Sequence, residues 1–224
     1  MRAITPEQMR MIEEGCEKLG VSRLLLMENA GASIAKYIKK KFRRMRELNV
    51  LVVAGTGNNG GDGFVAARHL AGFGGKISII LLGSEENIKT SEAKANWQTV
   101  RKMVDSVQIY EAPSRRAVES LKDFFMSADI IIDAIFGTGV KGPIKEPHSS
   151  AIDLINESRA YKLAVDVPSG LDPLTGDIHD KVVKAEATIS FHRAKVGLLK
   201  RKEITGRIIV APIGVPPEAE KGFC

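Results

Sequence analysis

Residues 49–63 read NVLVVAGTGNNGGDG, an apolar, valine-rich run followed directly by a glycine-rich loop. Turn-forming residues bound the run 49–54, which predicts a buried strand of a parallel sheet. After Asp62, the apolar positions of DGFVAARHL recur at the spacing of a helix that packs against a sheet. A loop between such a strand and such a helix presents backbone N–H groups at the positive end of the helix dipole. Residues 55–63 therefore predict an anion site, to which two asparagines and an aspartate add side-chain oxygens.

The same loop matches the pattern GxGxxG at Gly55, Gly57 and Gly60, which also occurs in dehydrogenases that bind nicotinamide dinucleotides. Those enzymes carry an acidic residue about 20 positions further on, at the end of the second strand. Glu85 and Glu86 are the acidic residues near that distance, and a Gly-Ser pair separates them from the predicted strand. The pattern alone therefore does not favour an ordinary dehydrogenase.

Strand and helix patterns alternate along the rest of the chain. Strands are predicted at 49–54, 76–82, 107–111, 129–135, 163–167, 187–191 and 208–211, and helices at 86–103, 115–127 and 149–157. Two further helices precede the first strand: one starts with the capping pattern of Thr5, Pro6 and Gln8, and the other follows Ser22 and ends in the basic run 39–46. This order predicts an α/β fold, a Rossmann-like three-layer α/β/α arrangement with a mostly parallel sheet and an N-terminal helical extension. Residues 1–224 are expected to form a single domain.

Composition limits the classes of protein to consider. The chain has 224 residues and a net charge of +6, and it contains two widely separated cysteines, Cys16 and Cys224. These predict neither a disulfide nor a zinc site, and a cytoplasmic location is the default. No apolar stretch approaches the ~20 residues that cross a bilayer, so no membrane partner is expected. Much of the basic excess is the run 39–46, interpreted as a solvated helix end, and aromatic residues are too few to predict nucleic-acid binding.

Polar residues follow several of the predicted strands. Asp133 ends the run IIID and Asp166 ends the run LAVD, which is followed by Val-Pro-Ser-Gly with Ser169. In parallel sheets, residues beyond the carboxyl ends of the strands meet at one rim, where ligands bind. Asn59, Asp133 and Ser169 would offer an amide oxygen, a carboxylate and a hydroxyl, a set that suits a monovalent cation or a magnesium ion shared with a substrate phosphate. The alternative is a hydrogen-bond network that holds the loops together.

Asp166 is the candidate for proton transfer, because the constrained turn that follows it should fix its position. The competing interpretation is an aspartate that only caps the turn. Asp172, which precedes a proline in the run DPLTGD, matches such a cap better. His192 follows a predicted strand and could approach the pocket.

Several segments together resemble one family, the YjeF N-terminal domain, whose enzymes are NAD(P)H-hydrate epimerases. They are LMENAG (26–31), AGTGNNGGDGFVAARHL (54–70), DAIFGTG (133–139), AVDVPSGLD (164–172) and FHRAKVGL (191–198). The similarity extends over about residues 5–217. It implies a commonly dimeric Rossmann-like enzyme that interconverts the R and S forms of C6-hydrated NADH or NADPH, and a functional link to a NAD(P)H-hydrate dehydratase that repairs the S form.

The resemblance also implies roles for particular residues. Asp166 would contact the altered ring, and potassium would bind to Asn59, Asp133 and Ser169. Residues that would hold the hydrated dinucleotide are Asn58, Asn59, Gly60, Gly61, Asp62, Gly137, Thr138, Gly139, Val140, Lys141, Gly142 and Pro143. Val140-Lys141 departs from the family pattern of a leucine followed by a varied residue, and the roles of Lys141, His192 and Lys195 are not fixed. The rival interpretation is a non-catalytic dimeric binding or scaffold module of the same fold.

Overall fold

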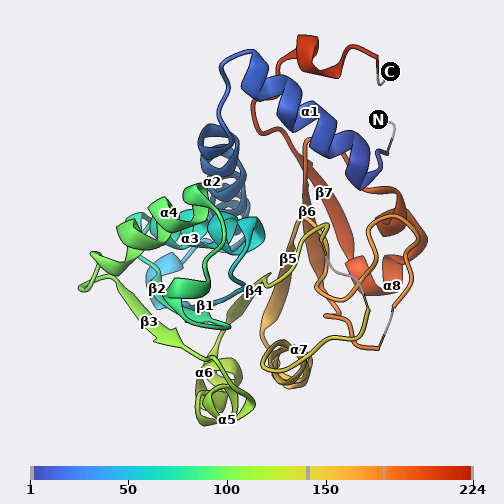
Figure 1. Ribbon diagram of the computed structural model, residues 1–224. Helices are drawn as coiled ribbons and strands as arrows, with labels where there is room; N and C mark the ends of the chain where they lie inside the picture. Colours follow the sequence, from blue (N-terminus) through green and yellow to red (C-terminus); the bar gives the residue numbers. More distant parts are fainter. Residues whose placement is uncertain (1–2, 140–141, 179, 223–224) are drawn as a thin grey trace.

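The computed structural model describes residues 3–139, 142–178 and 180–222, and its centre is one parallel sheet (Figure 1). The strand order is β3-β2-β1-β4-β5-β6-β7, and every ladder between neighbouring strands is parallel. The strands are β1 (Asn49–Ala54), β2 (Lys76–Leu81), β3 (Val107–Glu111), β4 (Ile130–Ala134), β5 (Tyr161–Val165), β6 (Ala187–Phe191) and β7 (Arg207–Ala211). The order reverses between β1 and β4, so the crevice beyond these two strands is the place where such a fold binds its ligand.

Helices cover both faces of the sheet, which confirms the predicted α/β class (Figure 1). The helices are α1 (Pro6–Lys18), α2 (Arg23–Lys41), α3 (Asn58–Gly72), α4 (Ser91–Arg101), α5 (Arg115–Ser120), α6 (Lys122–Ser127), α7 (His148–Glu157) and α8 (Lys202–Thr205). Short 3-10 helices are η1 (Met45–Glu47), η2 (Glu85–Asn87), η3 (Val196–Lys200) and η4 (Pro217–Glu220). Side chains of α1–α4 form one core cluster with the sheet, and those of α5–α7 form another.

Alternate residues of the central strands supply these two clusters. Val50 and Val52 of β1 point to the cluster of α1–α4, whereas Leu51 and Val53 point to the cluster of α5–α7. All four are at most 2 % exposed. Because both faces need apolar side chains, the strand reads as a continuous apolar run without polar alternation.

Helix boundaries differ from the predictions in four places. The helix predicted to continue through the basic run 39–46 ends at Lys41, because Phe42 takes an extended conformation, and Met45 lies in η1. The helix predicted at 86–103 spans only Ser91–Arg101, since Thr90 is its N-cap and η2 precedes it. The helix predicted at 115–127 is divided at Leu121 into α5 and α6. The helix predicted to follow Asp62 already begins at Asn58, so part of the glycine-rich loop is its first turn.

The N-terminal helices are integral to the core. The predicted capping box of α1 is present, with the Gln8 backbone N–H donating to Thr5 Oγ1 at 3.1 Å and the Thr5 N–H donating to Gln8 Oε1 at 2.8 Å. Ile12 and Cys16 of α1 are fully buried. Gly31 lets α2 approach α3 closely, because a Cβ at this position would lie 2.4 Å from Val65 Cβ. No helix in the described part of the chain is long and apolar enough to cross a membrane.

Candidate active site

A cavity of about 630 Å³ lies beyond the carboxyl ends of β1 and β4, where the strand order reverses. Its wall contains the residues that follow β1, β4 and β5, together with one residue of α1 and the start of α7. They are Glu13, Thr56, Gly57, Asn58, Asn59, Asp62, Lys89, Ile135, Phe136, Gly137, Thr138, Gly139, Pro143, Ile144, Lys145, His148 and Asp166. Segments far apart in the sequence therefore meet at the predicted rim.

The glycine-rich segment after β1 forms the floor of this cavity. Gly57 is the N-cap of α3 and has no side chain to bond the first-turn N–H groups, which leaves them available to a ligand. Gly60 permits the tight turn, since a Cβ there would lie 2.0 Å from the Gly55 carbonyl oxygen. Asn58 Oδ1 accepts a hydrogen bond of 2.6 Å from the Thr90 hydroxyl. These features agree with the anion site predicted for residues 55–63.

Asn59 faces the segment that follows β4. It is 8 % exposed, and its Oδ1 lies 3.3 Å from the position that a Cβ on Gly137 would occupy. Its buried Nδ2 finds no hydrogen-bond partner among the described residues. A buried, unpaired amide group in a cavity wall is a group that a ligand can satisfy.

Asp133 and Ser169 form a buried polar pair next to this wall, at 0 % and 1 % exposure. The Ser169 hydroxyl donates to Asp133 Oδ1 at 2.5 Å, and the Ser169 backbone N–H donates to Oδ2 at 2.8 Å. The Ile135 N–H also donates to Asp133, and the Phe136 N–H donates to Ser169 Oγ at 3.0 Å. Burial raises the pKa of Asp133 to about 6, against the opposing effect of these hydrogen bonds. The hydrogen-bond network that was the alternative to a cation site is therefore present, and it joins the carboxyl ends of β4 and β5.

The oxygen ligands of Asn59, Asp133 and Ser169 have the chemistry that suits a small monovalent ion. One buried carboxylate lies within a set of neutral oxygens, and Asn59 approaches the same loop from α3. In residues 3–139, 142–178 and 180–222, no three His, Cys, Asp or Glu side chains gather as a metal-binding cluster. One carboxylate with amide and hydroxyl oxygens is a hard oxygen set, unlike the nitrogen and sulfur ligands that zinc and iron favour.

Asp166 follows the last residue of β5 and lines the cavity. Its φ of 62° is left-handed, a conformation that costs free energy for a residue with a Cβ and that clusters at functional sites. The Phe191 N–H donates to its Oδ1 at 3.0 Å, and the Ser190 hydroxyl does so at 3.3 Å. The fixed position that the sequence predicts is therefore present.

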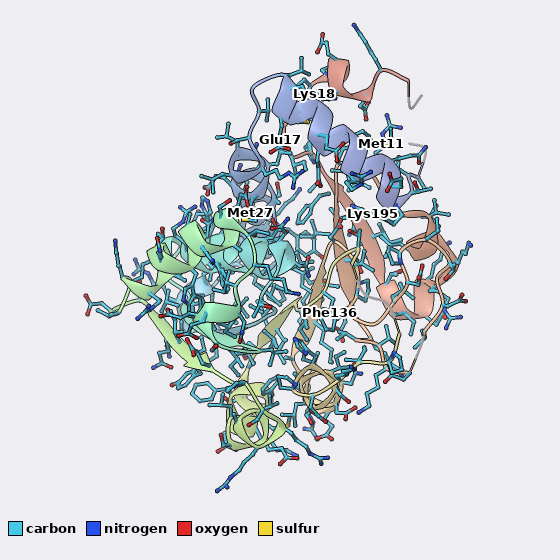
Figure 2. All side chains as sticks on the ribbon, in the orientation of Figure 1. Met11, Glu17, Lys18, Met27, Phe136 and Lys195 are labelled. Carbon is cyan, nitrogen blue, oxygen red and sulfur yellow. The ribbon has the colours of Figure 1, made fainter. Side chains whose placement is uncertain are left out.

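Lys195 forms an ion pair with the same oxygen, Asp166 Oδ1. The lysine is 0 % exposed and lies beside the N-terminal segment, where Ile4 forms a bridge with it (Figure 2). Among the described residues, Asp166 Oδ2 has no protein partner, so this oxygen is free to face the cavity. Sequence reasoning assigned no role to Lys195. Its position in the FHRAKVGL segment, which is shared with the resembled family, was the available signal.

Cationic and aromatic groups occupy another part of the wall. Lys89 and Lys145 line the cavity, and neither has an ion-pair partner in the part of the chain that the structure describes. The Phe136 ring, labelled in Figure 2, stacks on His148 with 4.7 Å between ring centroids. Burial and, to a lesser extent, the charge of Lys89 lower the pKa of His148.

The second predicted glycine segment, residues 137–143, lines the cavity only in part. Gly137, Thr138, Gly139 and Pro143 line the cavity, whereas Gly142 has a φ of 75° and does not. Val140 and Lys141 lie outside the described residues, so their predicted contacts with substrate stay predictions. Among the candidates after β1, Gly60 permits the turn and Gly61 leaves room for Met27 of α2 and Ala93 of α4, and neither is among the residues that line the cavity.

Two other candidates have structural roles. His192 is not among the described residues that line the cavity, so the predicted approach to the pocket is wrong; its Nε2 lies against the Glu220 carboxylate of η4, and burial lowers the pKa of the imidazole. Asp172 caps the turn as predicted, accepting hydrogen bonds of 2.8 Å from the N–H groups of Leu174 and Thr175.

A second cavity of about 590 Å³ lies at the amino ends of β1, β2 and β3. Asn49, Lys76 and Val107, the first residues of these strands, line it. None of the predicted site residues does, and functional groups of parallel sheets gather at the carboxyl ends instead.

Residues 23–197 match the family model described as YjeF-related protein N-terminus. The chain belongs to this family. It is 45 % identical over 220 residues to a protein of Nitrosopumilus maritimus named NAD(P)H-hydrate epimerase, covering 98 % of this chain and 99 % of that protein. It is 46 % identical to a bifunctional NAD(P)H-hydrate repair enzyme of Pyrobaculum aerophilum, of which it spans 43 %. A yeast protein of known crystal structure superposes with a TM-score of 0.76 at 27 % identity, covering 93 % of this chain and 90 % of that chain.

Proposed function

We propose that this protein is an epimerase that interconverts the R and S forms of C6-hydrated NADH and NADPH. The observation that carries the proposal is Asp166, a carboxylate fixed by Lys195 in the wall of a cavity at the switch point. The YjeF-related family, and relatives named NAD(P)H-hydrate epimerase that are as long as this chain, supply the substrate class.

The reaction replaces the hydroxyl group at one ring carbon, and protons move to and from the oxygens. C6 of the hydrated ring is a hemiaminal carbon, so the ring nitrogen can expel the hydroxyl group and leave an iminium ion. Water then adds to the other face. A carboxylate in contact with the ring can move the protons and favour the cation electrostatically. The partners of Asp166 support this role, because Oδ1 bonds Lys195, Phe191 and Ser190 while Oδ2 has no partner among the described residues.

The remaining wall suits the dinucleotide that carries the ring. The first-turn N–H groups of α3 can bond phosphate oxygens, and the unpaired Lys89 and Lys145 can neutralise them. The stacked Phe136 and His148 offer a flat surface at the same wall. The volume of about 630 Å³ lies in the range of small-molecule sites.

Potassium would be held by Asn59, Asp133 and Ser169. Bound there, it would supply a positive charge close to the ends of β4 and β5. The chain's own contribution is the buried Asp133–Ser169 pair, which fixes both strand ends and therefore the turn that carries Asp166.

Two alternatives receive less support. A scaffold module needs neither a buried lysine held against a cavity carboxylate nor the unpaired Asn59 amide, and both are present. An ordinary dehydrogenase needs an acidic residue at the end of β2, but Glu85 lies in η2 and bonds the Trp97 indole N–H at 3.0 Å. We further propose that the protein acts in the cytoplasm as a homodimer and works together with a NAD(P)H-hydrate dehydratase. Relatives named bifunctional NAD(P)H-hydrate repair enzyme, of which this chain spans 43 %, support the link to a second activity.

The test is direct turnover. Purified protein is incubated with the R form of hydrated NADH in potassium buffer, and the two epimers are separated by chromatography or followed by NMR. The proposal predicts an approach to equilibrium far faster than in buffer alone. An unchanged rate with both hydrated NADH and hydrated NADPH would exclude the function.

A further inference from the structure

A second carboxyl group, Asp62 of α3, lines the same cavity as Asp166. It is 9 % exposed and also borders a smaller space between α1, α2 and α3. No described residue forms a hydrogen bond or ion pair with its side chain. A buried carboxyl group without a partner costs free energy, and such a cost is typical of groups kept for a reaction.

The charged groups around Asp62 come from four segments of the chain. Glu13 of α1 and Asp166 after β5 are negative, and Lys195 after β6 is positive but already paired with Asp166. Arg23 of α2 borders the smaller space and forms an ion pair with Glu17 at 3.1 Å. Burial first, and then the charges of Asp166 and Glu13, raise the pKa of Asp62 well above its ordinary value. Asp62 therefore keeps its proton where an exposed aspartate has lost it.

Asp166 has the opposite surroundings. It accepts hydrogen bonds from a backbone N–H and a hydroxyl and forms an ion pair with an ammonium group. The two carboxyl groups come from different elements and lie in the same cavity wall. Paired titratable groups in contrasting environments are the arrangement that divides acid and base roles.

We infer that Asp62 is the acid that protonates the departing C6 hydroxyl, and that Asp166 is the base that deprotonates the incoming water. This inference rests on the proposed epimerase function and assigns its proton transfers to two residues, in place of Asp166 alone. Asp62 thereby becomes a catalytic residue as well as part of the binding segment.

The protons and electrons balance. The ring-nitrogen lone pair forms the N1=C6 bond while the C6–O bond breaks, and the leaving oxygen takes the Asp62 proton and departs as water. A second water forms the new C6–O bond, the N1=C6 pair returns to nitrogen, and the released proton goes to Asp166. Passage of that proton through solvent back to Asp62 restores the starting state, and the reverse epimerisation uses the two groups in exchanged roles.

The experiment measures kcat and KM for epimerisation between pH 5 and pH 9 in the intact protein. Asp62→Asn is expected to lower kcat at least about 100-fold, with KM changed less than about threefold. It should also remove the alkaline decline of kcat that ionisation of Asp62 produces in the wild type. A variant with wild-type kcat, or with the same alkaline decline, would overturn the inference.

The Glu13→Gln variant provides a second test of the inference, because it leaves Asp62 unchanged. Removing one of the negative neighbours lowers the pKa of Asp62, so the alkaline decline of kcat should move to lower pH. An unmoved decline would overturn the assignment even if Asp62→Asn does not fold. If the wild type does not interconvert the epimers, the proposed function is overturned as well. If both the wild type and the Asp62→Asn variant are active, only the role of Asp62 is rejected.

Discussion

Gly60 offers a sharp test of how the glycine-rich segment is built. A Cβ added at this position would lie 2.0 Å from the Gly55 carbonyl oxygen and 3.0 Å from its carbon. Ordinary contacts between heavy atoms begin at about 3.5 Å, so the atoms would have to separate by roughly 1.5 Å. Both partners are backbone, so the end of β1 would have to move away from the first turn of α3. Overpacking of this kind costs about 1–3 kcal/mol, and we expect Gly60→Ala to lose that much unfolding free energy.

Gly57→Ala is the matched control in the same segment. Nothing lies within 4 Å of its added Cβ, and its φ of −105° suits any residue. We expect a loss below about 1 kcal/mol, since alanine is a somewhat poorer N-cap than glycine. Denaturant unfolding of both variants and the wild type measures the difference. Equal stability of the two variants would refute the close approach of Gly60 to Gly55.

Two further predictions concern charged groups of the site. Potassium at about five times its dissociation constant should stabilise the protein by about 1 kcal/mol, and Asp133→Asn should abolish this gain. Equal thermal midpoints in potassium and in a bulky organic cation would contradict the proposed potassium site. The raised pKa of Asp62 means that the folded state binds its proton more tightly than the unfolded state, so the stability it contributes declines as pH rises above about 4. Asp62→Asn should therefore gain stability relative to the wild type between pH 4 and pH 8, which denaturant unfolding at both pH values measures.

Much of the fold follows from the apolar runs. Each predicted strand exists within two residues of its expected ends, because central strands buried on both faces need continuous apolar stretches. The helix ends were less predictable. Basic residues after Lys41 fit a solvated helix as well as a loop, and the glycines of 57–63 gave no sign that α3 begins at Asn58.

Site residues at the ends of strands could be predicted from the sequence, whereas site residues brought together by tertiary packing could not. Asp133 lies at the carboxyl end of β4, and Asp166 and Ser169 follow β5, so their convergence could be expected from topology. Glu13 lines the cavity, and Lys195 contacts Asp166 in its wall, because tertiary packing brings α1 and the segment after β6 to the end of β5. No local pattern shows that a lysine 29 positions after Asp166 contacts it.

The most direct measurement is the epimerisation rate of Asp166→Asn beside Asp172→Asn. Both substitutions remove a negative charge from the segment 164–172, but Asp172 caps a turn and is not among the described residues that line the cavity, and asparagine keeps its acceptor oxygen. Asp166→Asn should interconvert the hydrates at least about 100-fold more slowly while still binding them, whereas Asp172→Asn should keep nearly the wild-type rate. An Asp166→Asn variant that turns over like the wild type would contradict the assignment of the ring chemistry to this carboxylate.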